Sequence, residues 1–280
     1  MKSTSWSLKD VAEDCASYLR EKGVDGAKLS SDLLVGHVLG FTRLEMILHP
    51  DYELGQSEIS KIHELVRRRG RGEPVAYILG KKEFYALELE VDARVLVPRP
   101  ETELIVDLVK DLFDRDSDFL FADIGTGSGA IAAALLHLFP KSKCLLADIS
   151  MPALKLAAGN VRKYFQEVHS LIVQSDLASC LKGSRYDLVV SNPPYLTEAD
   201  FYELDKEVSG FEPREALVAG RYRSEMHRKI AEQAHPALKP DGWLIMEMDC
   251  RQKHLQETIF ENQANKWVDS FVCKDLSGLD

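Results

Sequence analysis

The chain has 280 residues, a formal net charge of −10, 45% hydrophobic residues and 29% charged residues. This composition predicts a folded core, and no hydrophobic run reaches the roughly 18 residues of a membrane-spanning helix, so we expect a cytoplasmic protein that does not enter membranes. The acidic balance argues against general nucleic-acid binding, and the five scattered cysteines form no CxxC pair and predict free thiols.

Residues 1–75 are predicted to form a helical domain. Hydrophobic residues recur at helical spacing in four segments, with Ser7 and Thr42 as N-caps and Gly40 as a stop signal. The segments are residues 8–19, residues 29–38, a short stretch after Thr42, and residues 59–66. Because the connections are short, we interpret these helices as a compact bundle.

A basic cluster, Arg67, Arg68, Arg69 and Arg71, ends the fourth predicted helix. Residues 1–90 carry 13 basic and 15 acidic side chains, whereas residues 91–280 carry 22 and 30. The cluster therefore stands out in an acidic protein. Two interpretations stay open: it contacts an acidic patch on a partner protein, or its charges complement the carboxyl end of the helix dipole.

Residues 76–98 are interpreted as a connector between two domains. The alternation of Leu87, Leu89 and Val91 predicts a strand or hairpin. Pro98 and Pro100 favour an extended backbone in the residues that precede them.

Residues 99–280 alternate between helical and strand patterns. Helices are predicted at residues 104–112, 130–138, 152–164 and 226–238, and strands at residues 119–124, 144–147, 171–173, 186–190 and 243–248. Such alternation predicts an α/β fold with a doubly wound, mostly parallel sheet. Ligands of such sheets bind beyond the carboxyl ends of the strands.

The first motif, Phe121 to Gly129, reads FADIGTGSG and leads from a buried strand into a helix. Glycines let the backbone turn tightly and let a ligand lie against it. Asp123 could orient this loop or meet a cationic ligand, and Asp148, at the end of the next strand, could hold two ribose hydroxyls. The spacing is not GxGxxG, which disfavours dinucleotide binding, and a purely structural turn stays possible.

The second motif, Ser191 to Tyr195, reads SNPPY and follows another buried strand. Asn192 offers a side-chain carbonyl, Pro193 a backbone carbonyl and Tyr195 a flat face. Together they could hold a planar NH₂ group. Amide and exocyclic nitrogens are poor nucleophiles, and two acceptors on the N–H groups would orient the nitrogen and stabilise its developing positive charge. A plain double-proline turn is the alternative.

With these motifs the chain resembles a known family. DIGTGSGAI at 123–131 is similar to the cofactor loop of class I S-adenosylmethionine methyltransferases, and NPPY to the signature of members that methylate amino groups. Three further segments resemble the HemK/PrmC family of protein-(glutamine-N5) methyltransferases of peptide chain release factors. They are EPVAYILG at 73–80, VLVPRPETE at 95–103 and FEPREAL at 211–217.

The resemblance implies a class I methyltransferase fold with S-adenosylmethionine as cofactor, and release factors as partners of a monomer. It also implies site residues. The cofactor would contact Gly125, Thr126, Gly127, Ser128, Gly129, Asp148, Asp176, Leu177 and Asn192. The glutamine would meet Asn192, Pro193, Pro194 and Tyr195, with Arg99 and Glu101 in the wall of the site; for Glu101 and Glu103, a role in complementing the helix dipole stays equally open. No histidine spacing predicts a metal.

The sequence departs from the family pattern near its end. Asp249 and Cys250 stand where the family usually has glycine and tyrosine, and family members normally continue into one more strand after residue 280. Two alternative functions stay open. One is methylation of adenine N6 or guanine N2 in nucleic acid, with Tyr195 stacking on a flipped base. The other is a catalytically silent protein that only binds the cofactor.

Overall fold

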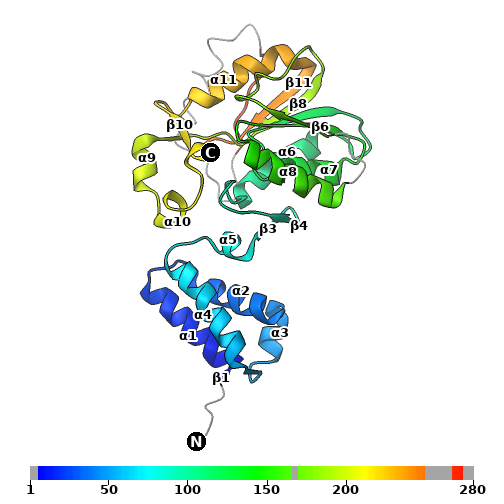
Figure 1. Ribbon diagram of the computed structural model, residues 1–280. Coiled ribbons are helices and arrows are strands. Elements are labelled where there is room, and N and C mark those ends of the chain that lie inside the picture. The colour runs from blue at the N-terminus through cyan, green and yellow to red at the C-terminus, as the bar shows by residue number, and fades with distance from the viewer. Residues whose placement is uncertain (1–5, 166–169, 250–266, 274–280) are drawn as a thin grey trace, which may run out of the picture. The chain divides into compact units, whose positions relative to one another are not determined.

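A computed structural model describes residues 6–165, 170–249 and 267–273 (Figure 1). The chain divides into two compact units. The N-terminal unit comprises Met1–Gly80 and Asp205–Phe211. The second unit comprises Lys81–Leu204 and Glu212–Asp280 and is called the catalytic unit because it contains both predicted methyltransferase motifs. The predicted connector, residues 76–98, is thus shared between them. No helix in the described ranges is both long and hydrophobic enough to cross a membrane.

The N-terminal unit is helical, as the sequence predicts. Its described helices are α1 (Leu8–Glu21), α2 (Ala27–Leu39), α3 (Arg43–Leu48), α4 (Gln56–Gly70), α5 (Val75–Leu79) and α10 (Lys206–Ser209), and Trp6–Ser7 (β1) pairs with Glu53–Leu54 (β2). The predicted signals are confirmed: Ser7 caps α1, Gly40 ends α2 in the left-handed conformation, and Thr42 forms a capping box with Glu45. The sequence analysis missed α5 and α10.

The basic cluster is partly internal. Arg69 is only 4% exposed, and its Nη2 lies 2.7 Å from Oε2 of Glu207 on α10. Its Nη1 donates to the carbonyl oxygen of Glu73, and Arg68 forms a two-point ion pair with the Glu73 carboxylate. A buried guanidinium requires such partners. Arg69 is therefore an internal residue of the unit, which neither interpretation of the basic cluster included, and the ion pairs of both arginines hold the unit together.

The catalytic unit begins with a β-hairpin, β3 (Lys81–Phe84) and β4 (Leu87–Glu90), which confirms the predicted alternation. Tyr85 and Ala86 form its turn with positive φ angles of 49° and 60°. Glu103 receives the backbone N–H of Tyr85 on Oε1 at 2.9 Å. The Glu103 carboxylate therefore has a specific partner in the turn, which neither of its predicted roles included.

The five strands of the main sheet are all parallel, in the order β11-β8-β5-β6-β7. They are β5 (Leu120–Ile124), β6 (Lys143–Asp148), β7 (Ser170–Gln174), β8 (Tyr186–Ser191) and β11 (Leu238–Met246). The chain starts at β5 in the centre, runs outward through β6 to β7, and then crosses back to β8. This is the doubly wound α/β fold that the sequence predicts, with a switch point between β5 and β8.

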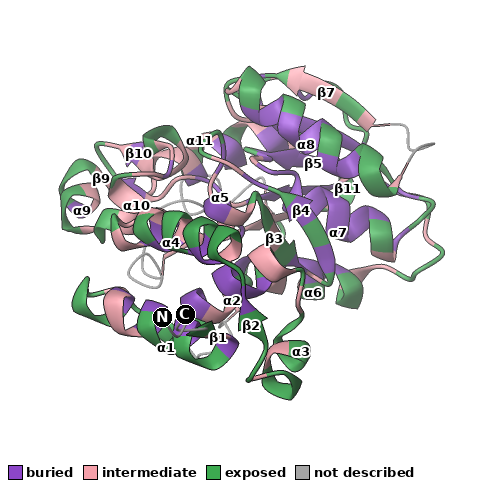
Figure 2. Cartoon of the chain, turned by 60° about the horizontal axis from the view of Figure 1, so that its bottom comes forward, coloured by how far each residue is buried: buried purple, intermediate pink, exposed green. Residues whose placement is uncertain are grey.

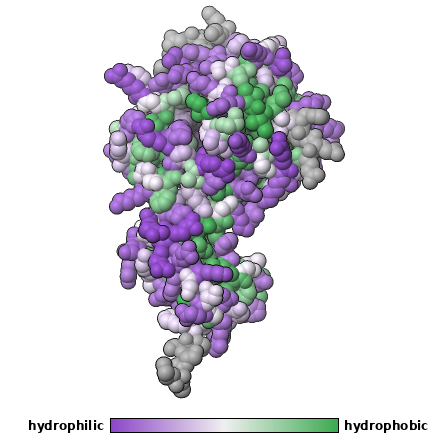
Figure 3. All heavy atoms as spheres, in the orientation of Figure 1, coloured by the Kyte–Doolittle hydropathy of each residue, from purple (hydrophilic) through white to green (hydrophobic). Residues whose placement is uncertain are grey.

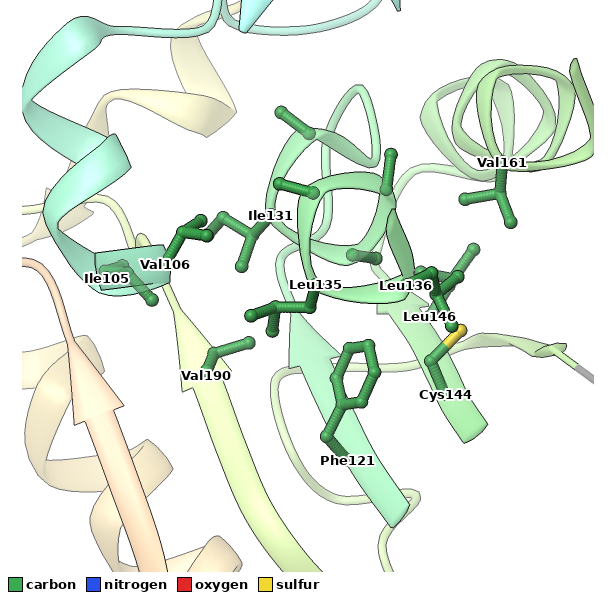
Figure 4. Packing of buried hydrophobic residues seen from close by; sticks show 14 of the residues in the cluster. Ile105, Val106, Phe121, Ile131, Leu135, Leu136, Cys144, Leu146, Val161 and Val190 are labelled. Atoms are coloured by element: carbon green, nitrogen blue, oxygen red, sulfur yellow. The ribbon is translucent and has the colours of Figure 1, made fainter. Parts of the chain in front are cut away.

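Helices cover both faces of the sheet, as Figure 2 shows by the buried strands between them. On one face lie α6 (Glu103–Leu112), α7 (Ala130–Leu138) and α8 (Met151–Tyr164); on the other lies α11 (Glu225–Ala234). Figure 4 shows Leu135 of α7 against Phe121 of β5 and Val190 of β8. The central strands β5, β6 and β8 are hydrophobic on both sides because both of their faces are buried, whereas the outer strands β7 and β11 are more exposed.

The remaining elements are short. They are α9 (Glu198–Glu203), β9 (Leu196–Thr197), β10 (Val218–Gly220) and the 3₁₀ turns Pro100–Thr102, Arg214–Ala216 and His235–Ala237. The helix predicted to reach residue 238 ends at Ala234, because Pro236 lacks the N–H that an α-helix requires. The predicted anomaly at Cys250 and the chain end lie outside the described residues.

Candidate active site

Three neighbouring strands end at the same level of the sheet. Ile124 of β5 pairs with Ser191 of β8, and Ser191 pairs with Met246 of β11. The next residues are Gly125, Asn192 and Glu247. Parallel strands present their carboxyl ends at one edge, so the two sequence motifs and Glu247 meet there, beside the switch point.

Backbone hydrogen bonds hold the glycine-rich loop against β6. The N–H groups of Gly125 and Thr126 both donate to the carbonyl oxygen of Ala147 on β6, at 2.8 and 3.0 Å. Gly125, Gly127 and Gly129 have φ angles of 67°, 54° and 78°, which side chains disfavour. Gly129 has a second reason to be glycine, since a Cβ there would lie 3.1 Å from Cα of Ala157 on α8.

Asp123 is fully buried and orients this loop. Its Oδ2 accepts from the Thr126 hydroxyl at 2.7 Å and from the Ala132 N–H at 3.3 Å. Among the described residues its Oδ1 has no hydrogen-bond partner. Burial raises the pKa of this carboxyl to about 7. Of the two predicted roles, the geometry matches orientation of the loop.

Asp148 ends β6 and faces the same loop. Its Oδ2 accepts from the Gly127 N–H at 2.9 Å and its Oδ1 from the Ser150 N–H at 2.8 Å. Burial raises its pKa, while these backbone N–H groups oppose the shift. Each carboxylate oxygen keeps a second lone pair, so both can still accept from a ligand.

A cavity of about 300 Å³ opens above these strand ends. Its wall contains ten of the predicted site residues: Arg99, Gly125, Thr126, Gly127, Ser128, Asp148, Asp176, Leu177, Asn192 and Pro194. Gly129, Pro193, Tyr195 and Glu101, which the structure also describes, lie outside the wall. Burial and the charges of Glu247 and Asp249 raise the pKa of the Tyr195 hydroxyl.

Asn192 is tied to two side chains that the sequence analysis did not single out as site residues. Its Nδ2 donates to Oγ1 of Thr102 at 3.0 Å, and the Thr102 hydroxyl lies 2.6 Å from Oε2 of Glu247. Thr102 lies within the PRPETE segment, so that motif was a signal for it. Glu247 lies two residues before Asp249 and opens the segment that was compared with the family pattern near the chain end, so that segment was a signal for Glu247.

Two of the three further family-like segments, VLVPRPETE and FEPREAL, meet beside the cavity. Glu212 of FEPREAL has a buried carboxylate that accepts from Nη2 of Arg99 at 2.6 Å and from the Val97 N–H at 3.1 Å. Arg99 lines the cavity, and this ion pair holds its guanidinium in place. Glu212 lies 113 residues from Arg99, so no local pattern in the sequence connects the two side chains.

A parallel sheet of this order, with a glycine-rich loop after β5 and Asn-Pro-Pro-Tyr after β8, defines a class I methyltransferase. The chain belongs to the HemK/PrmC family of release factor glutamine methyltransferases. Residues 10–80 match the family described as "PrmC N-terminal domain", and residues 102–207 match "Methyltransferase small domain".

Relatives match over nearly the full chain. The release factor glutamine methyltransferase of Nitratidesulfovibrio vulgaris is 36% identical over 98% of this chain and 93% of its own length. That of Rhodopirellula baltica is 35% identical over 98% and 94%. Among solved structures, the "hMettl16 catalytic domain in complex with MAT2A 3'UTR hairpin 6" is 17% identical over 74% of this chain and 73% of its own, with a TM-score of 0.52, which shows a shared fold.

The family depends on S-adenosylmethionine, and the cavity fits this cofactor. A Cβ at Gly125 or Gly127 would meet no protein atom closer than 3.9 Å, so the loop backbone borders open space. Asp148, Asp176 and Glu215 give the wall acidic groups, whereas the cofactor carries a sulfonium and an ammonium. The open backbone and these acidic groups agree with the cofactor. The wall also contains two basic side chains, Arg94 and Arg99, of which Arg99 is paired with Glu212.

Proposed function

We propose that this protein transfers a methyl group from S-adenosylmethionine to the side-chain amide nitrogen of the glutamine in the Gly-Gly-Gln motif of peptide chain release factors. The observation that carries the proposal is the position of Asn192 in the cavity wall, with its amide nitrogen bound to Thr102. This leaves Oδ1 as the atom of the side chain that can accept from an incoming NH₂ group. The full-length relatives support the substrate.

Different residues of the cavity wall would contact different parts of the cofactor. When bound, S-adenosylmethionine supplies an electrophilic methyl group on a sulfonium. Gly125 to Gly129 would hold its methionine part, Asp148 would accept from its ribose hydroxyls, and Asp176 with Leu177 would contact the adenine. These assignments follow the order of the loops along the carboxyl edge of the sheet.

The acceptor residues would prepare the amide. Oδ1 of Asn192 and the carbonyl oxygen of Pro193 would accept the two N–H groups of the glutamine, with Pro194 and Tyr195 beside it. Arg99 would form part of the surrounding wall, whereas Glu101, which was predicted for the wall, lies outside it. Accepting both N–H bonds increases electron density on nitrogen and stabilises the positive charge that develops there. The nitrogen can lose its proton after methyl transfer, so this arrangement requires no general base before attack.

The N-terminal unit offers a surface for the release factor. Leu44, Ile47 and Leu48 of α3 are 65%, 68% and 63% exposed, and hydrophobic surface is visible on this unit in Figure 3. Exposed hydrophobic groups that lie together mark interaction sites. We expect Ile47→Asp to raise KM for the release factor and to leave the Kd of S-adenosylmethionine unchanged. A monomer acting in the cytoplasm is part of the proposal.

The experiment is incubation of the protein with S-adenosylmethionine and a bacterial release factor, followed by peptide mass spectrometry. One added methyl group on the Gly-Gly-Gln glutamine is the expected result. The matched control is a release factor in which that glutamine is replaced by asparagine, which should stay unmodified. If the cofactor binds but no peptide gains a methyl group, the proposal is wrong, and RNA and DNA acceptors should be tested next.

A further inference from the structure

Two hydrogen bonds connect Asn192 to Thr102 and Thr102 to Glu247. Glu247 lies outside the cavity wall, and its carboxylate contacts the hydroxyl of Thr102, which belongs to that wall. Thr102 is 5% exposed and touches both the wall and Glu247. No substrate contact in the proposed reaction requires the Glu247 carboxylate, so its presence beside Asn192 needs another explanation.

The direction of the hydrogen bonds follows from the chemistry of the groups. An ionised carboxylate only accepts, so the single hydroxyl proton of Thr102 points to Oε2 of Glu247. The Thr102 oxygen then has only lone pairs to offer, and it accepts from Nδ2 of Asn192. The NH₂ side of the Asn192 amide is therefore committed to Thr102.

The backbone of Glu247 is fixed on both sides. Its N–H donates to the carbonyl oxygen of Ser191 at 3.0 Å, directly before Asn192. Its carbonyl oxygen lies 2.8 Å from Nε2 of His227, which is 1% exposed and must donate here because a carbonyl can only accept. The carboxylate is thus held at the end of β11 next to the end of β8.

We propose that Thr102 and Glu247 are positioning residues that fix the side-chain amide of Asn192 with Oδ1 toward the substrate and Nδ2 away from it. Rotation of this amide by 180° would present N–H groups to the N–H groups of the glutamine, which would oppose binding. An asparagine held by water alone has no such preference. The inference rests on the proposed function, because a fixed Asn192 amide matters for turnover only if Oδ1 accepts a hydrogen bond from the substrate glutamine.

The charge state of Glu247 decides which way the hydrogen bonds run between Glu247, Thr102 and Asn192. Burial and the charge of Glu101 raise the pKa of Glu247, while Thr102, Asn192 and Arg99 oppose the shift; Tyr195 and His227 are the other titratable groups facing it. When protonated, Glu247 can donate to Thr102, and Thr102 can then donate to Oδ1 of a rotated Asn192. Turnover should therefore fall as pH falls through the pKa of Glu247.

The test compares Thr102→Val, Thr102→Ser and Glu247→Gln with a matched control, Ser142→Ala. Ser142 is also a buried hydroxyl, with one hydrogen bond to the Phe139 carbonyl, but it precedes β6 at the opposite edge of the sheet. Thr102→Val should lower kcat on the order of 100-fold, as small misplacements of a reacting group do, with little change in the Kd of S-adenosylmethionine. Thr102→Ser should restore most of that loss, Ser142→Ala should keep kcat, and Glu247→Gln should lower kcat and remove the acid limb of its pH profile.

A second readout requires neither cofactor nor substrate. In ¹⁵N-asparagine-labelled protein, the Asn192 side-chain NH₂ signal is identified by its loss in Asn192→Ala. Its protons should exchange slowly with D₂O in the wild type and fast in Thr102→Val. Fast exchange in the wild type, wild-type kcat in Thr102→Val, or an equal loss in Ser142→Ala would each overturn the inference. If the wild type leaves the release factor unmethylated, the proposed function fails, while the exchange rates still decide the role of Thr102.

Discussion

The two halves of the cavity are built in different ways. The cofactor half is a continuous loop, residues 125–129, whose shape comes from its own glycines and from backbone hydrogen bonds to β6. The acceptor half is assembled from Thr102, Asn192 and Glu247. Asn192 lies 90 residues and Glu247 145 residues from Thr102 along the chain. One half is therefore a local structure, and the other exists only once the sheet has formed.

This difference predicts which property each substitution should change. Changes in the loop should act on stability and cofactor affinity together, because the loop also packs the sheet against α8. Changes in the acceptor half should act on turnover and leave cofactor binding intact.

The largest effect is expected for Asn192→Ala. Loss of an oriented group that stabilises developing charge typically costs about 100- to 1000-fold in kcat, and we expect a loss of this size here. Measured kcat with a release factor, together with the Kd of S-adenosylmethionine by calorimetry, checks it. A parallel loss of cofactor affinity would mean that the two halves are not separable.

Gly129→Ala, in the cofactor half, should lower the stability of the protein. Its Cβ would lie 3.1 Å from Cα and Cβ of Ala157, and the φ angle of 78° disfavours a side chain, so the free energy of unfolding should fall by about 1–3 kcal/mol. The control is Gly159→Ala on α8, where a Cβ meets no atom within 4 Å and helix propensity should add up to about 1 kcal/mol. Urea denaturation of both variants decides; equal stabilities would remove the packing argument.

Asn160→Ala tests how the loop is supported. Asn160 is 1% exposed; its Nδ2 donates to the carbonyl oxygens of Ser128 and Glu90, and its Oδ1 accepts from the Glu90 N–H. Removing it leaves buried backbone groups of the loop and of β4 unpaired, which should cost about 1–3 kcal/mol of stability and weaken cofactor binding. Thermal unfolding with and without S-adenosylmethionine measures both, and an unchanged Kd would limit Asn160 to a structural role.

Asp123→Asn should give the smallest effect at acidic pH, where Asp123 is protonated and the amide that replaces it is also uncharged. Because burial raises the pKa of Asp123 to about 7, the folded state favours its protonated form. That contribution to stability is complete below the unfolded pKa and is lost as pH rises to about 7, at up to about 1.4 kcal/mol per pH unit. In Asp123→Asn the free energy of unfolding should lack this dependence on pH. Urea midpoints between pH 4 and pH 8 test it, and parallel curves for both proteins would contradict it.

The same contrast explains what the sequence could predict. The fold class, the position of both motifs directly after buried strands and the capping signals at Ser7 and Thr42 depend on local patterns, and the structure confirms them. The roles assigned to single site residues stay predictions. Thr102 and Glu247 were missed because no spacing rule connects them, and α10 was missed because its four residues carry no periodicity.

The ion pair between Arg69 and Glu207 has a consequence for how this protein can be divided. The N-terminal unit is discontinuous: Asp205–Phe211 belongs to it, although the chain on both sides belongs to the catalytic unit. Three peptide crossings, rather than one, connect the two units. A gene shortened to start at Lys81 would therefore keep a fragment of the missing unit, with Glu207 deprived of its arginine. The N-terminal unit is not an exchangeable cassette, and any chimera must carry residues 205–211 from the same parent as residues 1–80.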